Sequence, residues 1–352
     1  MTPDPSPLLG TGLHAVGAGS AALCYAPQRY LHRWSWQTYW LVQAAGCWLI
    51  FPWLFALATI PELGTVLAEA PKAAMLKSYL LGAVYGIGGI AFGVAIRHIG
   101  YSLTYALAIA ISCILGTLLP PILAGTLGTT LAQTGAGYVI GGVLLGGLAM
   151  AVTGYAGFRR EREMADAALP SAFNARLGLP IVLLAGVLSA VFNLALQAAQ
   201  PVADVAAKHG AGHFQGNIIY LFSNSGAFTT TLVYVAWLAT RGGTWGEFFR
   251  TADGTGLIRN YLLSALTGLL WYLQFFFYGL GHVRMGTFAF SSWAIHMILL
   301  ILLSSGFGVG IGEWKACRPR TKLLVAASLA LLFAAVGSIT QGNYLASAPA
   351  AH

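Results

Sequence analysis

Residues 261–280 read YLLSALTGLLWYLQFFFYGL, a run of twenty residues without a charged side chain. A helix needs about 20 mostly apolar residues to cross the hydrocarbon core of a bilayer. Lipid offers no hydrogen bonds to a bare backbone, so such a run must be helical. Ten stretches have this length and character or come close to it: residues 8–25, 38–59, 78–96, 103–124, 138–158, 179–200, 217–239, 261–280, 287–311 and 323–341. The sequence therefore predicts an all-α integral membrane protein with ten transmembrane helices.

The composition agrees with a membrane protein. Hydrophobic residues make up 57% of the 352 residues and charged residues only 8%, whereas a soluble domain carries about 25% charged residues. This excludes a soluble enzyme, a disordered chain and a nucleic-acid-binding protein. The leader MTPDPSP carries no positive charge, so the first apolar stretch is not expected to be a secretory signal. The four cysteines show no paired or metal-binding spacing, which predicts small core residues.

Two stretches of the chain resemble one another. Residues 77–86, KSYLLGAVYG, and residues 259–268, RNYLLSALTG, share a basic residue, Tyr, Leu, Leu, Ala and Gly at corresponding positions. Chance similarity between apolar helices is the alternative explanation. A duplication predicts two five-helix repeats, residues 1–158 and 179–352, joined by a cytoplasmic connector at 159–178. Five is odd, so the second repeat is inverted, an arrangement typical of transporters whose substrate site lies near the midplane.

The basic residues predict an orientation. The termini and even-numbered loops hold Lys72, Lys77, Lys208 and Arg284, while the odd-numbered loops hold the other fourteen of the eighteen Lys and Arg residues. Cytoplasmic loops of membrane proteins collect positive charge. We therefore expect both termini to face outward.

Neutral polar side chains recur along single faces of the predicted helices. Trp271, Gln274, Tyr278 and His282 follow one another at i, i+3, i+7 and i+11. Further candidates for substrate binding are Asn193, Gln197 and Asn224. Polar groups in a membrane are costly unless they are paired or face a wet cavity. Amides and hydroxyls beside flat aromatic rings suit a neutral polyol or sugar, although hydrogen bonding between helices is the alternative for any one stripe.

Histidine is the titratable residue type available at depth. No acidic residue lies well inside a predicted span, and the chain has no HExxH, no Ser/His/Asp set and no phosphate-binding glycine loop. We therefore expect no enzyme, no metal site and no cofactor. Histidine titrates near neutral pH and can carry a transported proton. The candidates are His296 in mid-span, then His14 and His282, with a hydrogen-bonded structural histidine as the alternative for each.

Several motifs resemble those of bacterial L-rhamnose–proton symporters, in the drug/metabolite transporter superfamily. Residues 20–27, SAALCYAP, with 34–40, WSWQTYW, are similar to the first hairpin of that family. Residues 268–278, GLLWYLQFFFY, followed by Gly281 and His282, are more specific, and Trp293 with His296 completes the match. The resemblance runs over essentially the whole chain. It implies ten helices, an inner-membrane location and sugar uptake coupled to protons, and it adds Tyr25 and Trp293 to the expected substrate-binding residues.

The leading hypothesis is a secondary active transporter that imports a small sugar, such as L-rhamnose or a related deoxyhexose, with protons by alternating access. A carrier or exporter of another small neutral metabolite is the alternative within transport. A multispan membrane enzyme would need an acidic or metal-binding cluster, which the acidic residues do not offer. The expected partners are the sugar, protons and membrane lipid, with no nucleic acid and no obligate protein partner.

Overall fold

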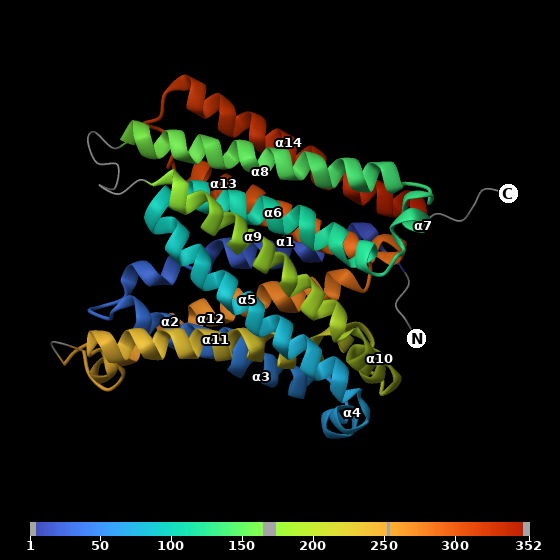
Figure 1. Cartoon of the computed structure of the whole chain (residues 1–352), viewed down its shortest axis with the longest axis horizontal. Coiled ribbons are helices and arrows are strands. Elements are labelled where there is room, and N and C mark those ends of the chain that lie inside the picture. The colour runs from blue at the N-terminus through green and yellow to red at the C-terminus, as the bar shows by residue number, and fades with distance from the viewer. Residues whose placement is uncertain (1–4, 165–173, 252–253, 348–352) are drawn as a thin grey trace. The chain divides into compact units, whose positions relative to one another are not determined.

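The computed structural model describes residues 5–164, 174–251 and 254–347, which are helices joined by short turns without a strand among them (Figure 1). The elements are α1 Pro7–Leu23, η1 Ala26–Tyr30, α2 Trp36–Ala45, η2 Gly46–Ile50, α3 Phe51–Thr59, α4 Leu63–Glu69, α5 Lys72–Ile99, α6 Tyr101–Leu123, α7 Leu127–Leu131, α8 Ala136–Met164, α9 Ala175–Ala198, α10 Gln200–Lys208, η3 Gly212–Ile218, α11 Tyr220–Gly242, η4 Trp245–Phe248, α12 Leu257–His282, η5 Gly286–Ser291, α13 Ser292–Gly310 and α14 Pro319–Ser347.

Within the described residues, nine helical segments are long and apolar enough to cross a membrane. They are Trp36–Thr59, Lys72–Ile96, Leu103–Leu123, Ala136–Met164, Arg176–Lys208, Gly212–Gly242, Leu257–His282, Gly286–Gly310 and Pro319–Ser347. The remaining predicted span corresponds to α1, whose 17 residues lie at the short end of the range for a spanning helix. The described part of the chain is therefore all-helical and of the multi-pass membrane type.

The chain divides into two compact units that cut across the predicted repeats. Of the described residues, those within Ser20–Ile87 and Leu194–Gly279 form unit 1, and those within Pro3–Gly19, Gly88–Asn193 and Leu280–His352 form unit 2. Each unit therefore takes helices from both halves of the chain. The bounds of the repeats stay a prediction, because a repeat is defined by topology and not by compactness. Part of the expected connector, residues 165–173, lies outside the described residues.

In unit 1, small residues let helices cross with their backbones almost touching. A Cβ on Gly86 of α5 would lie 3.0 Å from the carbonyl oxygen of Ala227 in α11. A Cβ on Gly268 of α12 would lie 2.8 Å from the carbonyl oxygen of Gln43 in α2. Close approach of this kind is how helices gain packing energy in lipid, where no hydrophobic effect drives them together. The first crossing joins α5 to α11, and the second sets the faces that α2 and α12 turn toward each other.

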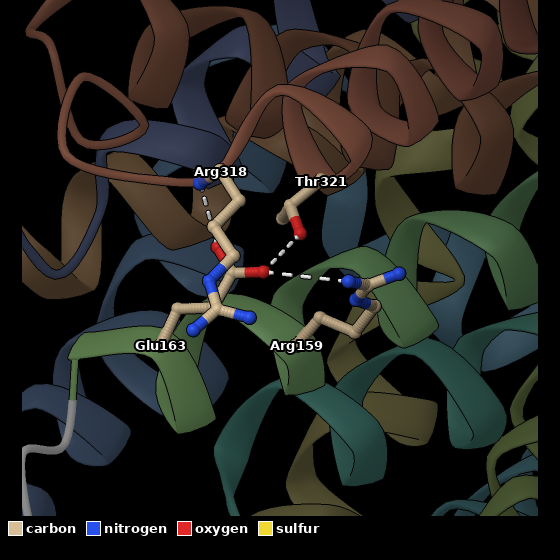
Figure 2. A network of polar contacts seen from close by, with 4 residues as sticks. All are labelled: Arg159, Glu163, Arg318 and Thr321. Carbon is tan, nitrogen blue, oxygen red and sulfur yellow. Dashed lines mark hydrogen bonds and ion pairs between the residues drawn. The ribbon is translucent and has the colours of Figure 1, made fainter.

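In unit 2, α8 and α14 run side by side over much of their lengths (Figure 1). Glu163, near the end of α8, accepts hydrogen bonds from the backbone N–H of Arg318 at 2.8 Å and the hydroxyl of Thr321 at 2.6 Å, and Arg159 pairs with it at 3.5 Å (Figure 2). The first N–H groups of a helix have no partner within the helix and favour a negative charge. Glu163 therefore caps α14 and fixes its start against α8.

Candidate functional site

Three aromatic side chains surround Trp271 of α12 in unit 1. The ring of Trp271 lies 5.5 Å from Tyr25, 5.6 Å from Trp40 and 5.6 Å from Trp48, measured between centroids and meeting edge to face. Tyr25 stacks on Trp40 at 6.5 Å. We call Tyr25, Trp40, Trp48 and Trp271 the aromatic cluster. Such rings offer flat apolar faces with polar edges, which suits a ligand with both C–H and hydroxyl groups.

An irregular turn aligns two members of the cluster. Residues Gly46–Ile50 form a π-helical turn between α2 and α3, which ends two residues before Pro52. Pro52 has no N–H to donate to the carbonyl four residues earlier, which loosens the helix at this point. Trp40 and Trp48 would stand about 80° apart on a regular helix of 3.6 residues per turn. The wider turn absorbs part of that rotation, so both rings reach Trp271.

Polar side chains accompany the cluster in unit 1. Gln274 and Tyr278, on the same helix as Trp271, are buried, and so are Asn224 of α11 and Gln43 of α2. In contrast, the side chain of Gln197 is exposed. Of the stripe predicted from Trp271 to His282, Gln274 and Tyr278 are therefore buried and the two ends are half-buried, whereas of the two candidates on α9 only Asn193 is buried.

In unit 2, Asn193 and Trp293 both donate to the backbone of α6. The amide of Asn193 donates to the carbonyl of Gly116 at 2.6 Å, and the indole of Trp293 donates to the carbonyl of Ser112 at 2.9 Å. Gly116 lies four residues before Pro120, which has no N–H and so cannot form the usual helical bond to it. The side chain of Asn193 supplies the missing donor. Substrate binding by Trp293 would have to use the face of its ring.

The three candidate histidines all belong to unit 2. The rings of His14 in α1 and His296 in α13 are buried and meet edge to face, with centroids 5.9 Å apart. A Cβ on Gly281 would lie 2.9 Å from Nε2 of His14, so only glycine lets this end of α12 approach the ring. The next residue, His282, has its Nδ1 3.1 Å from the hydroxyl of Ser292. The structure thus brings together imidazoles that lie 282 residues apart in the chain.

The sequence model of a family described as L-rhamnose-proton symport protein matches residues 5–342. The chain belongs to the L-rhamnose-proton symporter family. The L-rhamnose-proton symporter of Mannheimia succiniciproducens is 33% identical over 93% of this chain and 96% of its own length. Those of Yersinia pestis and Yersinia pseudotuberculosis are 32% identical over 88% of this chain and 90% of theirs. The resemblance expected from the sequence motifs is confirmed, and membership of this family makes the chain a transporter and not an enzyme.

The carboxylates described in this symporter-family chain lie near the ends of its helices. Glu247 accepts hydrogen bonds from the backbone N–H of Ser35 at 2.8 Å and from the hydroxyl of Thr38 at 2.7 Å, so it holds the start of α2. Glu313 faces Arg160, which also lies over the ring of Trp314 at 5.4 Å. Within the described ranges, no group of three or more His, Cys, Asp and Glu residues could hold a metal ion. These carboxylates therefore have structural partners at helix ends.

Sequence reasoning missed Gln43 and Trp48 as candidates in this transporter. Both are buried in the α2–α3 segment, where Trp48 belongs to the aromatic cluster and the backbone of Gln43 lies against Gly268. Trp36 and Trp40 are spaced i, i+4 and share one face of α2, where their rings stack at 5.1 Å. Extending that spacing as a regular helix would not have aligned Trp48 with Trp40. The proline at position 52 was the available signal that the helix changes its turn nearby.

Proposed function

We propose that this protein imports L-rhamnose, or a closely related deoxyhexose, together with protons by alternating access. The observation that carries the proposal is similarity along nearly the whole chain to proteins named L-rhamnose-proton symporter. The aromatic cluster supports it from the geometry. L-rhamnose carries a methyl group where a hexose has a hydroxymethyl group, so one part of its surface is apolar and the rest is rich in hydroxyls.

We assign the sugar contacts to unit 1. Trp271 and Tyr25 provide ring faces for C–H groups, and Gln274, Tyr278 and Asn224 provide amide and hydroxyl groups for hydrogen bonds. A hydrophobic pocket distinguishes ligands that differ by one small group only about 10- to 200-fold. The hydrogen-bonding residues therefore carry most of the discrimination among sugars. Asn193 and Trp293 hold α6 in this proposal, and the exposed Gln197 is the weakest of the predicted contacts.

We assign proton coupling to the pair of His14 and His296, with His282 beside them. Two imidazolium ions at 5.9 Å inside a membrane protein would repel strongly. The pair therefore holds at most one positive charge, and the proton belongs to the pair and not to one ring. A proton taken up from the outside in one conformation and released to the inside in the other would couple sugar movement to the proton gradient.

The ten spans form two inverted five-helix repeats in this proposal. Inversion maps spans two and three onto spans seven and eight. The crossing of the second span with the eighth, at Gly268 and Gln43, then becomes the crossing of the seventh with the third, at Ala227 and Gly86. Gly86 and Gly268 occupy the same place in the duplicated motif. Matching glycines at matching crossings support a common origin for the two halves.

The proposed location is the bacterial inner membrane with both termini in the periplasm, on the distribution of Lys and Arg. Cysteine labelling tests it, because the four native cysteines are buried and buried thiols react slowly. In intact cells an impermeant maleimide should label Lys72→Cys and spare Lys315→Cys, both at exposed positions. The reverse pattern would overturn the orientation.

Uptake of radiolabelled L-rhamnose into membrane vesicles tests the function. Vesicles with an imposed proton gradient, acidic outside, should accumulate the sugar above its external concentration. Vesicles without the gradient should only equilibrate, and a protonophore should abolish accumulation without blocking exchange. L-Mannose, which differs by the hydroxyl on carbon 6, should compete weakly. Accumulation that persists without a proton gradient, or accumulation driven only by sodium, would contradict proton symport.

A further inference from the structure

The crossing of α2 and α12 holds polar atoms that have no partner. Gln43 is fully buried, and within the described part of the chain neither its amide oxygen nor its amide nitrogen has a hydrogen-bond partner. Trp48 is 4% exposed, and its indole N–H also has no hydrogen-bond partner there. Buried polar groups are satisfied in the great majority of cases, because leaving one unpaired lowers stability. Two such residues five positions apart on one segment require an explanation.

Their place relative to the aromatic cluster supplies one. The backbone of Gln43 lies against Gly268, one turn before Trp271 on α12. Trp40 and Trp48 flank Gln43 along the segment, and each ring contacts Trp271. The unpaired amide and indole N–H therefore belong to the helix crossing whose aromatic rings form the cluster.

The chemistry of these groups matches a polyol. The amide of Gln43 offers one acceptor and two donor hydrogens, and the indole of Trp48 offers one donor. Adjacent hydroxyls on a sugar ring can donate to an amide oxygen and accept from an amide or indole nitrogen at once. An apolar ligand would leave all these groups unpaired, and an anion would use only the donors. A neutral sugar with neighbouring hydroxyls uses both kinds of group.

We propose that Gln43 and Trp48 form the hydrogen-bonding centre of the sugar site, with Trp40 and Trp271 as its walls. The assignment rests on the proposed function and makes it more specific, because it names the groups that form hydrogen bonds with the sugar hydroxyls. In this arrangement the unpaired groups of Gln43 and Trp48 lower the stability of the sugar-free protein, and pairing them with the sugar raises its affinity. A site built to bond a hydroxyl rejects an analogue that lacks it far more strongly than an apolar pocket does. Gln43 therefore joins Gln274, Tyr278 and Asn224 among the residues that distinguish one deoxyhexose from another.

Purified protein and four variants test the proposal, with affinity read from tryptophan fluorescence and fold stability from the melting temperature. Gln43→Leu and Trp48→Phe keep most of the buried volume but remove the unpaired groups. Each should weaken L-rhamnose binding about 10- to 100-fold. Without sugar, each should melt at or above the wild-type temperature, because an unsatisfied group has been removed. A residue with a purely structural role would instead lose stability.

The matched control residues have the same side chains as Gln43 and Trp48 but lie outside the proposed site. Gln37, on the same helix, donates its amide to the hydroxyl of Thr244 at 3.2 Å. Gln37→Leu should lower the melting temperature and leave rhamnose affinity unchanged. Trp53→Phe removes the indole of an exposed residue in α3 and should change neither quantity. If folded Gln43→Leu and Trp48→Phe both bind L-rhamnose as the wild type does, or if their melting temperatures fall below that of Gln37→Leu, the assignment is wrong.

A panel of singly deoxygenated L-rhamnose analogues gives a second test that holds even if Gln43→Leu folds poorly, because Gln43→Asn keeps an amide. Removing the hydroxyl that Gln43 bonds should weaken binding to the wild type strongly. The same removal should weaken binding to Gln43→Leu or Gln43→Asn only slightly, because these variants have already lost the bond. Equal losses in all proteins for every analogue would overturn the assignment. If the wild type binds a different sugar and Gln43→Leu does not, the proposed substrate is wrong but the assignment of Gln43 to the sugar site is correct. If the wild type binds no sugar, both fail.

Discussion

The bond between Asn193 and the α6 carbonyl of Gly116 is the sharpest test of how this protein is held together. Gly116 lacks its helical donor because residue 120 is a proline. Asn193→Ala would remove the donor that replaces it at 2.6 Å. Pro120→Ala would return a backbone N–H to α6 in the place where the helix expects it. The loss caused by the first change should therefore depend on the second.

The expected magnitudes follow from burial. Hydrogen bonds between helices in membranes average about 0.6 kcal/mol and reach about 1.7 kcal/mol. The carbonyl of Gly116 has no helical alternative, so we expect Asn193→Ala to cost about 1.5 kcal/mol, near the upper end of that range. With Pro120→Ala present, the restored N–H can pair with the carbonyl, and the same change should cost about 0.5 kcal/mol. The interaction free energy between the two sites is then about 1 kcal/mol.

Unfolding by sodium dodecyl sulfate in mixed micelles measures these free energies. Asn217→Ala is the matched control, because the buried amide of Asn217 donates to the hydroxyl of Thr59 at 2.8 Å, an acceptor that no proline affects. Its cost should be the same with and without Pro120→Ala. Equal costs of Asn193→Ala in the two backgrounds would refute the reasoning. A large loss of rhamnose affinity in a stable Asn193→Ala protein would return Asn193 to the sugar site.

Four further predictions concern coupling, binding, packing and pH. His296→Gln should retain exchange of sugar across equilibrated vesicles and lose accumulation driven by a proton gradient, and accumulation that survives would exclude His296 as an obligatory proton carrier. Gln274→Ala should weaken rhamnose binding about 10-fold or more while folding persists, which equilibrium binding to the purified protein checks. Gly268→Val should lower the free energy of unfolding by about 1–3 kcal/mol, because its side chain meets the α2 carbonyl, whereas Gly89→Ala, with open space around it, should not. Hydrogen bonding to Glu69 raises the pKa of His209 above its ordinary value, so this contact stabilises the fold fully below about pH 6.5 and is lost as pH rises through the raised pKa; melting curves of His209→Gln against pH should lack that step.

Much of the architecture follows from local pattern. Long apolar runs predict the spans, because a helix is the local solution to hydrogen bonding in lipid. The spacing of Trp271, Gln274 and Tyr278 predicts a shared face, because a regular helix places i, i+3 and i+7 together. The structure has a continuous α12 there, with both Gln274 and Tyr278 buried. The family motifs in the same stretch also led to the correct family.

Other features could not follow from spacing, because the partners are far apart in the chain or the helix is irregular. Nothing in residues 7–23 indicates that His14 meets His296. The π-helical turn at 46–50 breaks the 3.6-residue period on which a prediction of the position of Trp48 would depend. In the sequence, Asn193 looks like a substrate-binding asparagine. Only the distance from its amide to the carbonyl of Gly116 shows that this amide already donates a hydrogen bond within the protein.

The sequence by itself determined the class of the molecule: a membrane protein of apolar helices, with neutral polar faces, few acids and the motifs of a sugar symporter. Hydrophobicity and helical period act over a few turns, and a single chain carries that information in full. Only the tertiary structure decided which polar groups are satisfied. Satisfaction depends on what a second helix brings within about 3 Å. Asn193 has a carbonyl within that distance, and its amide supports a helix interrupted by proline. Among the described residues Gln43 has no such partner, and we propose that its amide binds the sugar.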